Sequence, residues 1–180
     1  MIERVAEADE AIQDAYLANP DIAADVLRPA LRRATLAGRV VPVLCGSALH
    51  NKGIQQLLDA VNGYLPAPTD RPPVAGTDMR SGLPVNRPAD DGEPLAGLVF
   101  KIATDPYVGR LFFLRVYAGL LRKGQNVFNP RTRKRERVMK LVRLHADAQE
   151  ETDALRTGDI GAVVGLKEAT TGDTLCTENQ

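Results

Sequence analysis

Aromatic residues are scarce in this 180-residue sequence, at 4%, and tryptophan is absent. An apolar core must therefore consist mainly of aliphatic side chains, and a hydrophobic content of 44% is enough for a globular chain. No apolar run approaches the roughly 20 residues that span a bilayer, and the acidic start lacks the apolar core of a signal peptide. We therefore expect a cytoplasmic protein without a membrane partner.

Cysteine and histidine are also few. Cys45 and Cys176 lie far apart in apolar runs, and neither belongs to a CxxC or Cys/His pattern. This excludes a disulfide framework, predicts no metal site and suggests two buried free thiols. His50 and His145 are isolated, and no serine has a partner that would activate it. The sequence therefore predicts no catalytic residues.

Net charge is absent as well, since 23 basic residues balance 23 acidic ones. The distribution is uneven, however, because basic residues exceed acidic ones by 10 between Lys101 and His145. A local basic excess is typical of a surface that meets a polyanion, although a solvated barrel face would also account for it. The densest run is RTRKRER, which we place at a hairpin tip. Its basic residues are Arg131, Arg133, Lys134, Arg135 and Arg137.

The first third of the chain reads as helices around a single strand. Apolar spacing predicts a helix over Met1–Leu17 and a second over residues 22–36, which Pro29 should break into two pieces. The apolar run Val40–Cys45 suits a buried parallel strand, and a further helix is expected over Ile54–Leu65. Strand, small-residue turn and helix form the geometry that places ligands at the edge of an α/β sheet.

The rest of the chain predicts a linker and a barrel. Residues 66–94 are rich in proline, glycine and aspartate, with a possible edge strand at Val74 and Leu83–Val85. In Leu111–Ala118 both alternating faces are largely apolar, which fits a strand between a barrel interior and another packed layer. Short strands separated by Gly/Asp turns continue to the end. They predict a Greek-key type β-barrel, so the fold class is α+β with more than one domain.

Two stretches carry a family resemblance. FKIATDPYVGRLFFLRVYAG, RKRERVMKLVRLHA and GDIGAVVGLKEATTGDTLC together resemble the second domain of bacterial elongation factor G, a family of translational GTPases. Upstream, VVPVLCGSALHNKGIQQLLDAVNGYLPAP resembles the end of the nucleotide-binding domain of the same family. The resemblance implies a fragment of a longer factor. Residues 1–65 would be the C-terminal part of the GTP-binding domain with the tail of its insert, 66–94 a linker and 95–180 the second-domain barrel.

The resemblance also implies an activity for the parent protein. It would be a ribosome-dependent GTPase that binds GTP or GDP with Mg²⁺ and promotes translocation of tRNA and mRNA. Ser47, Ala48 and Leu49 would form its guanine-base loop. However, the sequence contains no GxxxxGK(S/T) phosphate loop, and Ile54 stands where an NKxD motif would have its aspartate. We therefore expect these residues alone to bind no cofactor and to hydrolyse no GTP.

The partners implied are small-subunit ribosomal RNA and the rest of the parent factor, with no role for DNA. The five basic residues of RTRKRER would then contact RNA, and Gly109 and Arg110 would face the nucleotide domain. A barrel loop capped by its own arginine is an equal alternative for Arg110. For the whole chain, the alternatives are a ribosome-protection or release-factor-recycling GTPase, or an independent RNA-binding β-barrel adaptor.

Overall fold

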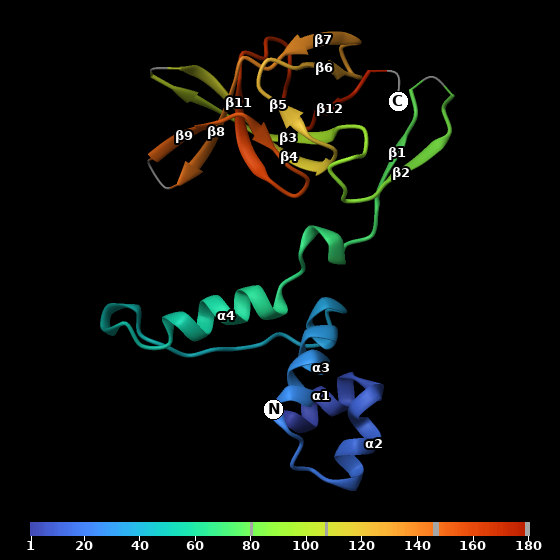
Figure 1. Cartoon of the computed structure of the whole chain (residues 1–180), viewed down its shortest axis with the longest axis vertical. Helices are drawn as coiled ribbons and strands as arrows, with labels where there is room; N and C mark the ends of the chain where they lie inside the picture. The colour runs from blue at the N-terminus through green and yellow to red at the C-terminus, as the bar shows by residue number, and fades with distance from the viewer. Residues whose placement is uncertain (80, 107, 146–147, 179–180) are drawn as a thin grey trace. The chain divides into compact units, whose positions relative to one another are not determined.

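The computed structural model describes residues 1–79, 81–106, 108–145 and 148–178. The chain divides into two compact units, Met1–Pro66 and Ala67–Gln180, which we call the helical unit and the barrel unit (Figure 1). Tyr107 and Ala146, which belong to the stretches quoted above for the family resemblance, lie outside the described residues. No helix in the described part of the chain is both long and apolar enough to cross a membrane.

The helical unit contains α1 (Ile2–Ala8), α2 (Glu10–Ala18), α3 (Ala24–Leu36), the short 3₁₀ turn η1 (Ala48–His50) and α4 (Ile54–Tyr64). The single helix predicted over Met1–Leu17 is wrong, because the chain breaks at Asp9. This residue has an extended backbone and caps α2 through its carboxylate, which accepts the Ala11 N–H at 3.0 Å. Arg33 Nε donates to the same carboxylate at 2.8 Å.

Helix α3 runs unbroken through Pro29, so the predicted break is wrong. Proline removes one hydrogen bond to the carbonyl four residues earlier. That position is exposed, whereas Leu27, Ala30 and Leu31 on the other face are buried in the core of the unit. Burial of this apolar face outweighs one missing bond, because each buried Leu contributes about 1.5–3 kcal/mol.

The segment Val40–Cys45 is extended but is not a strand, contrary to the prediction. A strand exists only where a neighbour accepts its backbone hydrogen bonds, and no described residue pairs with this segment. Val41 and Val43 are 83% and 91% exposed. The helix predicted over Ile54–Leu65 is confirmed as α4, and its apolar side chains are also largely exposed, among them Leu57, Leu58 and Val61.

The proline-rich segment contains the 3₁₀ turn η2 (Pro68–Asp70) and an antiparallel hairpin of β1 (Val74–Thr77) and β2 (Pro84–Arg87). The edge strand that Val74 and Leu83–Val85 suggested is therefore present. Arg87 contacts Glu93 at 3.4 Å, within the segment that leads into the barrel.

Ten further strands lie in the described residues of the barrel. Eight of them form one antiparallel sheet in the order β7-β6-β12-β3-β4-β11-β8-β9, and β5 pairs with β10. Their bounds are β3 (Ala96–Asp105), β4 (Gly109–Ala118), β5 (Leu121–Arg122), β6 (Asn126–Asn129), β7 (Lys134–Arg137), β8 (Lys140–His145), β9 (Ala148–Thr152), β10 (Ala154–Leu155), β11 (Ile160–Val164) and β12 (Thr174–Cys176).

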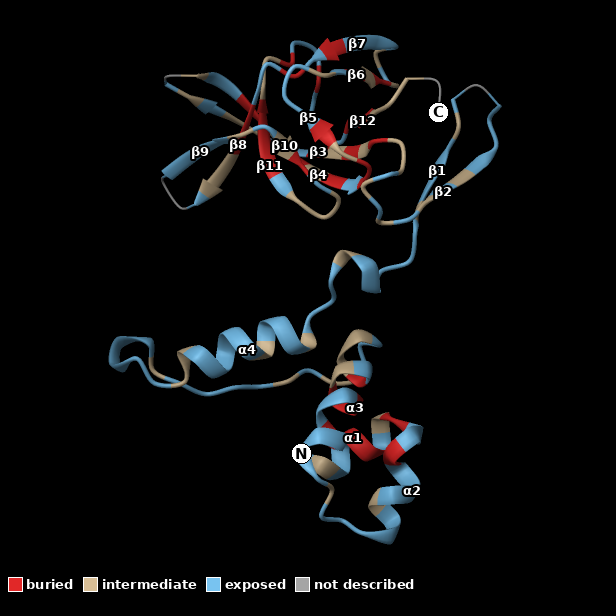
Figure 2. Cartoon of the chain, in the orientation of Figure 1, coloured by how far each residue is buried: buried red, intermediate tan, exposed pale blue. Residues whose placement is uncertain are grey.

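The barrel core is the apolar side of β4 and its neighbours (Figure 2). Phe112, Leu114 and Val116 are fully buried at alternate positions, as a strand with period two requires. On the other face Leu111 joins a smaller cluster with Val142 and Ala162. Apolar residues on both faces of β4 thus pack into two separate clusters, as the sequence suggested. The sheet encloses the larger one.

The sequence of residues 137–144 predicts one strand opposite Gln125–Phe128, with a possible bulge where the apolar residues break strict alternation. The structure differs, because β6 pairs with Lys134–Arg137 and β8 begins only at Lys140. Val138 donates its N–H to Gln125 O at 2.9 Å, and the chain then turns so that β8 pairs with β11 and β9. Val138 still follows the alternation of β7, since Glu136 and Val138 are both buried, and the pairing with β6 ends after it because the Met139 N–H bonds to Val164 O instead.

Candidate RNA interface

The basic run RTRKRER lies on the β6–β7 hairpin, at the tip that the sequence predicted. The turn forms because Asn129 Oδ1 accepts the Arg131 N–H at 3.1 Å and the Thr132 N–H at 3.4 Å, an Asx-type turn. Arg133 then adopts a left-handed backbone, with φ of 57°. The side chains of this run therefore leave one short hairpin in different directions.

Arg131 is directed toward a buried carboxylate. Its Nε donates to Asp173 Oδ1 at 2.6 Å and one terminal nitrogen to Asp173 Oδ2 at 2.9 Å, while that nitrogen also reaches Glu168 O at 3.0 Å. This bidentate geometry is the strong form of an ion pair. We therefore assign Arg131 to holding the hairpin against the β11–β12 loop. Its contact with RNA stays a sequence prediction.

The remaining cations of the run are accessible. Lys134 pairs with Glu168 at 2.5 Å and Arg135 pairs with Glu178, both at the surface. Arg133 and Arg137 form no ion pair within the described part of the chain. Exposed ion pairs contribute only about 0–1 kcal/mol, so these side chains can exchange a carboxylate for a phosphate at little expense.

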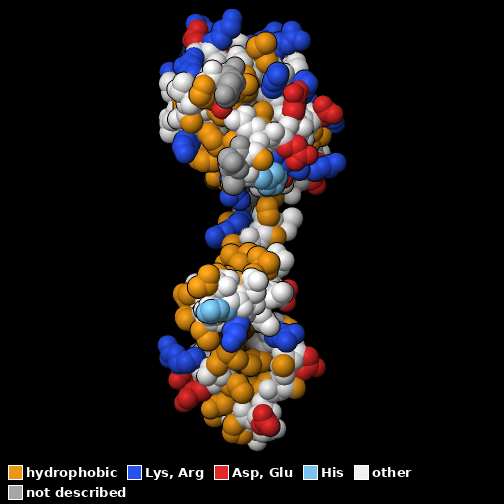
Figure 3. Space-filling model, turned by 90° about the vertical axis from the view of Figure 1, so that its left-hand side faces the viewer, with side chains coloured by type: hydrophobic (Ala, Val, Ile, Leu, Met, Phe, Trp, Pro, Cys, Tyr) orange, Lys and Arg blue, Asp and Glu red, His pale blue; other side chains and the backbone are white. Residues whose placement is uncertain are grey.

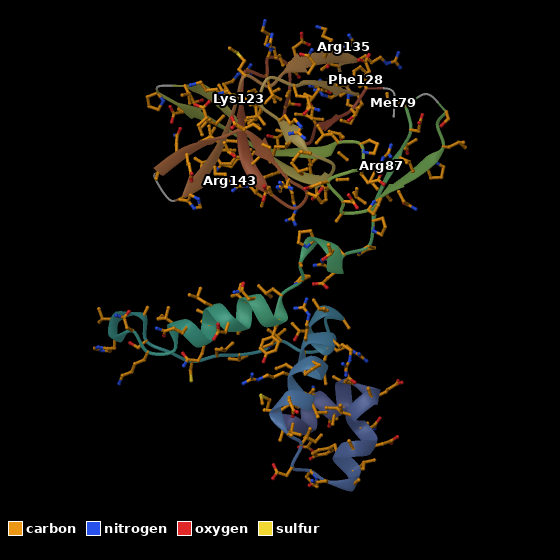
Figure 4. The ribbon with its side chains drawn as sticks, in the orientation of Figure 1. Met79, Arg87, Lys123, Phe128, Arg135 and Arg143 are labelled. Atoms are coloured by element: carbon orange, nitrogen blue, oxygen red, sulfur yellow. The ribbon has the colours of Figure 1, made fainter. Side chains whose placement is uncertain are left out.

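A cleft of about 630 Å³ lies beside this hairpin. Lys123 from the β5–β6 turn and Arg135 from β7, both labelled in Figure 4, line this cleft. Figure 3 shows Lys and Arg side chains spread over the face of the barrel unit that it displays. Sequence reasoning missed two of its members, because they are distant in sequence from RTRKRER. The cationic lining residues are Lys123, Lys134, Arg135, Arg137 and Lys167.

The floor of the cleft is fixed by Glu136, which is 6% exposed. Its Oε2 accepts two consecutive backbone N–H groups, from Lys167 at 2.5 Å and Glu168 at 3.0 Å. Asn129 joins this carboxylate to Asp173, with its Nδ2 at 3.4 Å from Glu136 and 2.9 Å from Asp173. A buried, satisfied polar network of this kind rigidifies what it joins. This network therefore holds in place the backbone of β7 and of the β11–β12 loop, which carry cationic side chains of the cleft.

Arg110 contacts the same loop. It follows Gly109, which opens β4 with φ of 79°, and it donates to Lys167 O at 2.7 Å. Its guanidinium also lies 5.2 Å from the ring centre of Phe112. The arginine thus supports the loop that carries Lys167, which is not the loop that precedes Arg110, so the alternative of a loop capped by its own arginine also stays a prediction. A role for Gly109 and Arg110 toward a nucleotide domain stays a prediction.

The Ser47–Leu49 segment forms a closed turn in the helical unit. Ser47 N–H donates to Lys52 O at 2.9 Å and Lys52 N–H returns to Ser47 O at 3.0 Å. A Cβ on Gly46 would lie 2.6 Å from Lys52 O, so this turn depends on glycine. With the Ser47 N–H already bonded, a guanine oxygen would have to meet Ala48 or Leu49. Because the sequence has no GxxxxGK(S/T) phosphate loop, we derive no nucleotide chemistry from these residues, and the expectation that they bind no cofactor stays a prediction.

The two cysteines are free, and the expectation that both are buried is wrong for Cys45, which is exposed. It lies next to the unpaired segment Val41–Leu44, so no neighbouring element covers it. Cys176 is half-buried on β12, and burial raises the pKa of its thiol. Within the described residues, no cluster of His, Cys, Asp and Glu could hold a metal ion.

The barrel unit should lose stability in acid through Asp173. The Arg131 guanidinium, with Asn129 and Thr170, holds the pKa of this carboxyl well below its ordinary 3.8, although burial alone would raise it. Because the folded pKa is the lower one, the stabilisation is complete above pH about 5 and declines as pH falls below about 4. Urea unfolding at pH 7, 5, 4 and 3 measures this decline. Asp173→Asn should flatten it, and an equally steep decline in that variant would contradict the assignment.

The described residues form a helical unit and an antiparallel barrel unit of the kind found in translation factors. Residues 94–178 match the family model of elongation factor G domain 2. Elongation factor G of Thermotoga neapolitana is 51% identical over 180 residues, which is 100% of this chain and 26% of that protein. Residues 94–178 therefore belong to the elongation factor G domain 2 family, and the chain as a whole is related to elongation factor G.

A solved structure has a similar fold. It is a protein of Thermus thermophilus with a TM-score of 0.72 and 24% sequence identity, and the match covers 99% of this chain and 24% of that one. At that identity the likeness concerns the fold. In both comparisons this chain spans about a quarter of the length of its relative.

Proposed function

We propose that this chain is part of a cytoplasmic, ribosome-dependent GTPase that promotes translocation of tRNA and mRNA. The sequence similarity to elongation factor G supports this proposal, because that similarity covers the helical unit as well as the barrel unit. If the chain were an independent RNA-binding barrel adaptor, its helical unit would not be expected to resemble elongation factor G as well. GTP and Mg²⁺ would bind mainly to residues outside the 180, and the turn at Ser47–Leu49 would contribute to the guanine site.

Within that factor, the barrel unit would bind the phosphates of small-subunit ribosomal RNA. The observation that carries this step is the cleft of about 630 Å³ with five cationic side chains around it. Lys and Arg side chains contact phosphates without regard to base sequence, and such contacts fix the position of a protein on its nucleic acid. The rigid floor under Glu136 keeps these charges in place before RNA binds, which reduces the entropy lost on binding.

Neutralising Arg137 or Lys167 should weaken the binding of small ribosomal subunits. Neither side chain forms an ion pair in the described part of the chain, so its removal leaves no carboxylate unpaired. For each phosphate that the variant no longer neutralises, the slope of log affinity against log salt should flatten by about 0.7–0.9. The measurement is fluorescence anisotropy of the chain, labelled at exposed Cys45, across a KCl series.

The matched control is Arg28→Ala, which removes the same charge from an exposed position in the helical unit. It should leave the slope unchanged. If Arg137→Ala and Lys167→Ala behave like Arg28→Ala, the cleft is not the RNA-binding surface. If the affinity of the unaltered chain does not change with salt concentration, phosphate contacts play no part in it.

A further inference from the structure

A second, mainly apolar groove of about 770 Å³ lies within the barrel unit. One wall is the β1–β2 hairpin and the other is the outer surface of β3, β6 and β12. Figure 4 labels Met79 and Arg87 on the hairpin side and Phe128 on the barrel side. Leu98, Phe128 and Cys176 are only partly buried on the barrel wall, so apolar surface remains accessible there.

Strand β1 has one paired and one unpaired edge. Asp78 N–H donates to Leu83 O at 2.9 Å, and Thr77 stands opposite Pro84, which has no N–H to donate. Antiparallel pairs alternate between bonded and non-bonded, so the bonded pairs are those of Gly76 and Val74. Ala75 and Thr77 therefore direct their N–H and C=O groups away from β2, and no described residue receives them.

The unpaired edge faces the groove. Every residue from Val74 to Met79 lines it, whereas β2 contributes only the alternate residues Val85 and Arg87. A strand that lines a cavity with consecutive residues presents its edge, and one that does so with alternate residues presents a face. The groove thus combines the free backbone donors and acceptors of Ala75 and Thr77 with an apolar wall on its other side.

We propose that this groove holds a β-strand from a part of the full-length polypeptide outside these 180 residues. The strand would add to β1 through Ala75 and Thr77 and turn alternate apolar side chains toward Phe128 and Leu98. Backbone pairing to a free edge gives such a strand its affinity, and the apolar wall selects its sequence pattern. A compact small molecule would leave the row of backbone groups unpaired.

The remainder of the same polypeptide is favoured as the source for two reasons. Related elongation factor G is about four times as long as this chain, since the match covers 26% of it. Thr177 and Glu178 already line the groove at the end of β12. A segment tethered so near acts at a high effective concentration, because closing a short loop loses little entropy. This inference does not depend on RNA binding.

Amide hydrogen exchange tests the strand directly and needs no substitution. In the 180-residue chain, the amides of Ala75 and Thr77 should exchange freely while that of Gly76 is protected. In the full-length gene product, Ala75 and Thr77 should exchange at least about tenfold more slowly, because both amides become hydrogen-bonded. Equal rates in the two proteins would overturn the proposal, as would a gene product no longer than these 180 residues.

Photo-crosslinking then identifies the occupant. p-Benzoylphenylalanine in place of Tyr117, which is 37% exposed at the groove, would be irradiated in the purified full-length protein. Mass spectrometry should find the crosslink within one molecule, on a segment outside the 180 residues with alternating apolar residues. A crosslink to a second copy or within the 180 residues would overturn the assignment, and so would the absence of any crosslink. The basic cleft is not involved, so these outcomes leave the RNA proposal untouched.

Discussion

Replacing Asp173 by alanine should lower the free energy of unfolding of the barrel unit by about 2–4 kcal/mol, because a buried acceptor of several hydrogen bonds is lost while its partner Arg131 stays half exposed. Asp173 is 5% exposed and accepts hydrogen bonds from Arg131, Asn129 and the Thr170 N–H. Alanine would leave the Thr170 N–H without its acceptor, while Arg131 would keep only Glu168 O and Asn129 only the longer contact with Glu136. The penalty of an unmatched buried donor exceeds the net gain of forming the bond.

Urea unfolding of the barrel unit, followed by far-ultraviolet circular dichroism, measures this loss. The matched control is Glu151→Ala, which removes one carboxylate from a surface ion pair with Lys123. A surface pair contributes little, so the control should shift the free energy by no more than about 1 kcal/mol. If the two variants lose similar amounts, Asp173 is not the centre of a buried network. Because Asn129 links Asp173 to Glu136, the Asp173 variant should also loosen the floor of the basic cleft.

The barrel was predictable from sequence because its signals are local. Alternation in Leu111–Ala118 separates Phe112 and Leu114 from Leu111 and Phe113, and the structure buries the two sets in different clusters. The hairpin turn at Lys123-Gly124 was predictable for the same reason, since Gly124 has φ of 80° in open space. Each of these features depends on a few adjacent residues.

The helical unit was harder because its outcomes depend on tertiary partners. The predicted helix break at Pro29 is wrong because burial of one face of α3 compensates for one lost backbone hydrogen bond. The predicted strand at Val40–Cys45 is wrong because a strand needs a neighbouring strand to pair with, and the described residues do not supply one. The helical spacing of apolar residues continues across Asp9, where α1 ends and α2 begins. Apolar spacing alone therefore cannot show that the Asp9 carboxylate caps α2.

The candidate site was found in part. A run of five cations in RTRKRER is visible in the sequence, but Lys123 and Lys167 join it only through the fold. The sequence also gives no sign that Arg131 turns inward, because its acceptor Asp173 is 42 residues away. The signal that could have been used is TGD at 171–173, where a turn aspartate close to a strand can serve as a buried acceptor. The groove along β1 has no sequence signature, since a free edge is a property of pairing.

Gly119→Ala should be about as damaging as the Asp173 substitution, and the comparison with Gly124→Ala shows why. Both glycines have a left-handed backbone, with φ of 76° and 80°, so alanine would be strained by about 1–2 kcal/mol at either position. A Cβ on Gly124 would meet nothing within 4 Å. A Cβ on Gly119 would lie 2.6 Å from Glu93 O and 2.7 Å from the backbone N and Cα of Leu95.

These clashes at Gly119 cannot be relieved by a rotamer change, because the atoms involved are backbone. Gly119 is also held on both sides, by its own N–H to Asp90 O at 2.8 Å and by Thr157 Oγ1 to its carbonyl at 3.0 Å. The extra loss over Gly124→Ala should therefore be about 1–3 kcal/mol, the range for forced overpacking. Urea unfolding of both variants measures it. If both variants lose the same free energy of unfolding, the segment Glu93–Leu95 can move away from the added Cβ. Glycine would then be needed at position 119 only for its left-handed backbone.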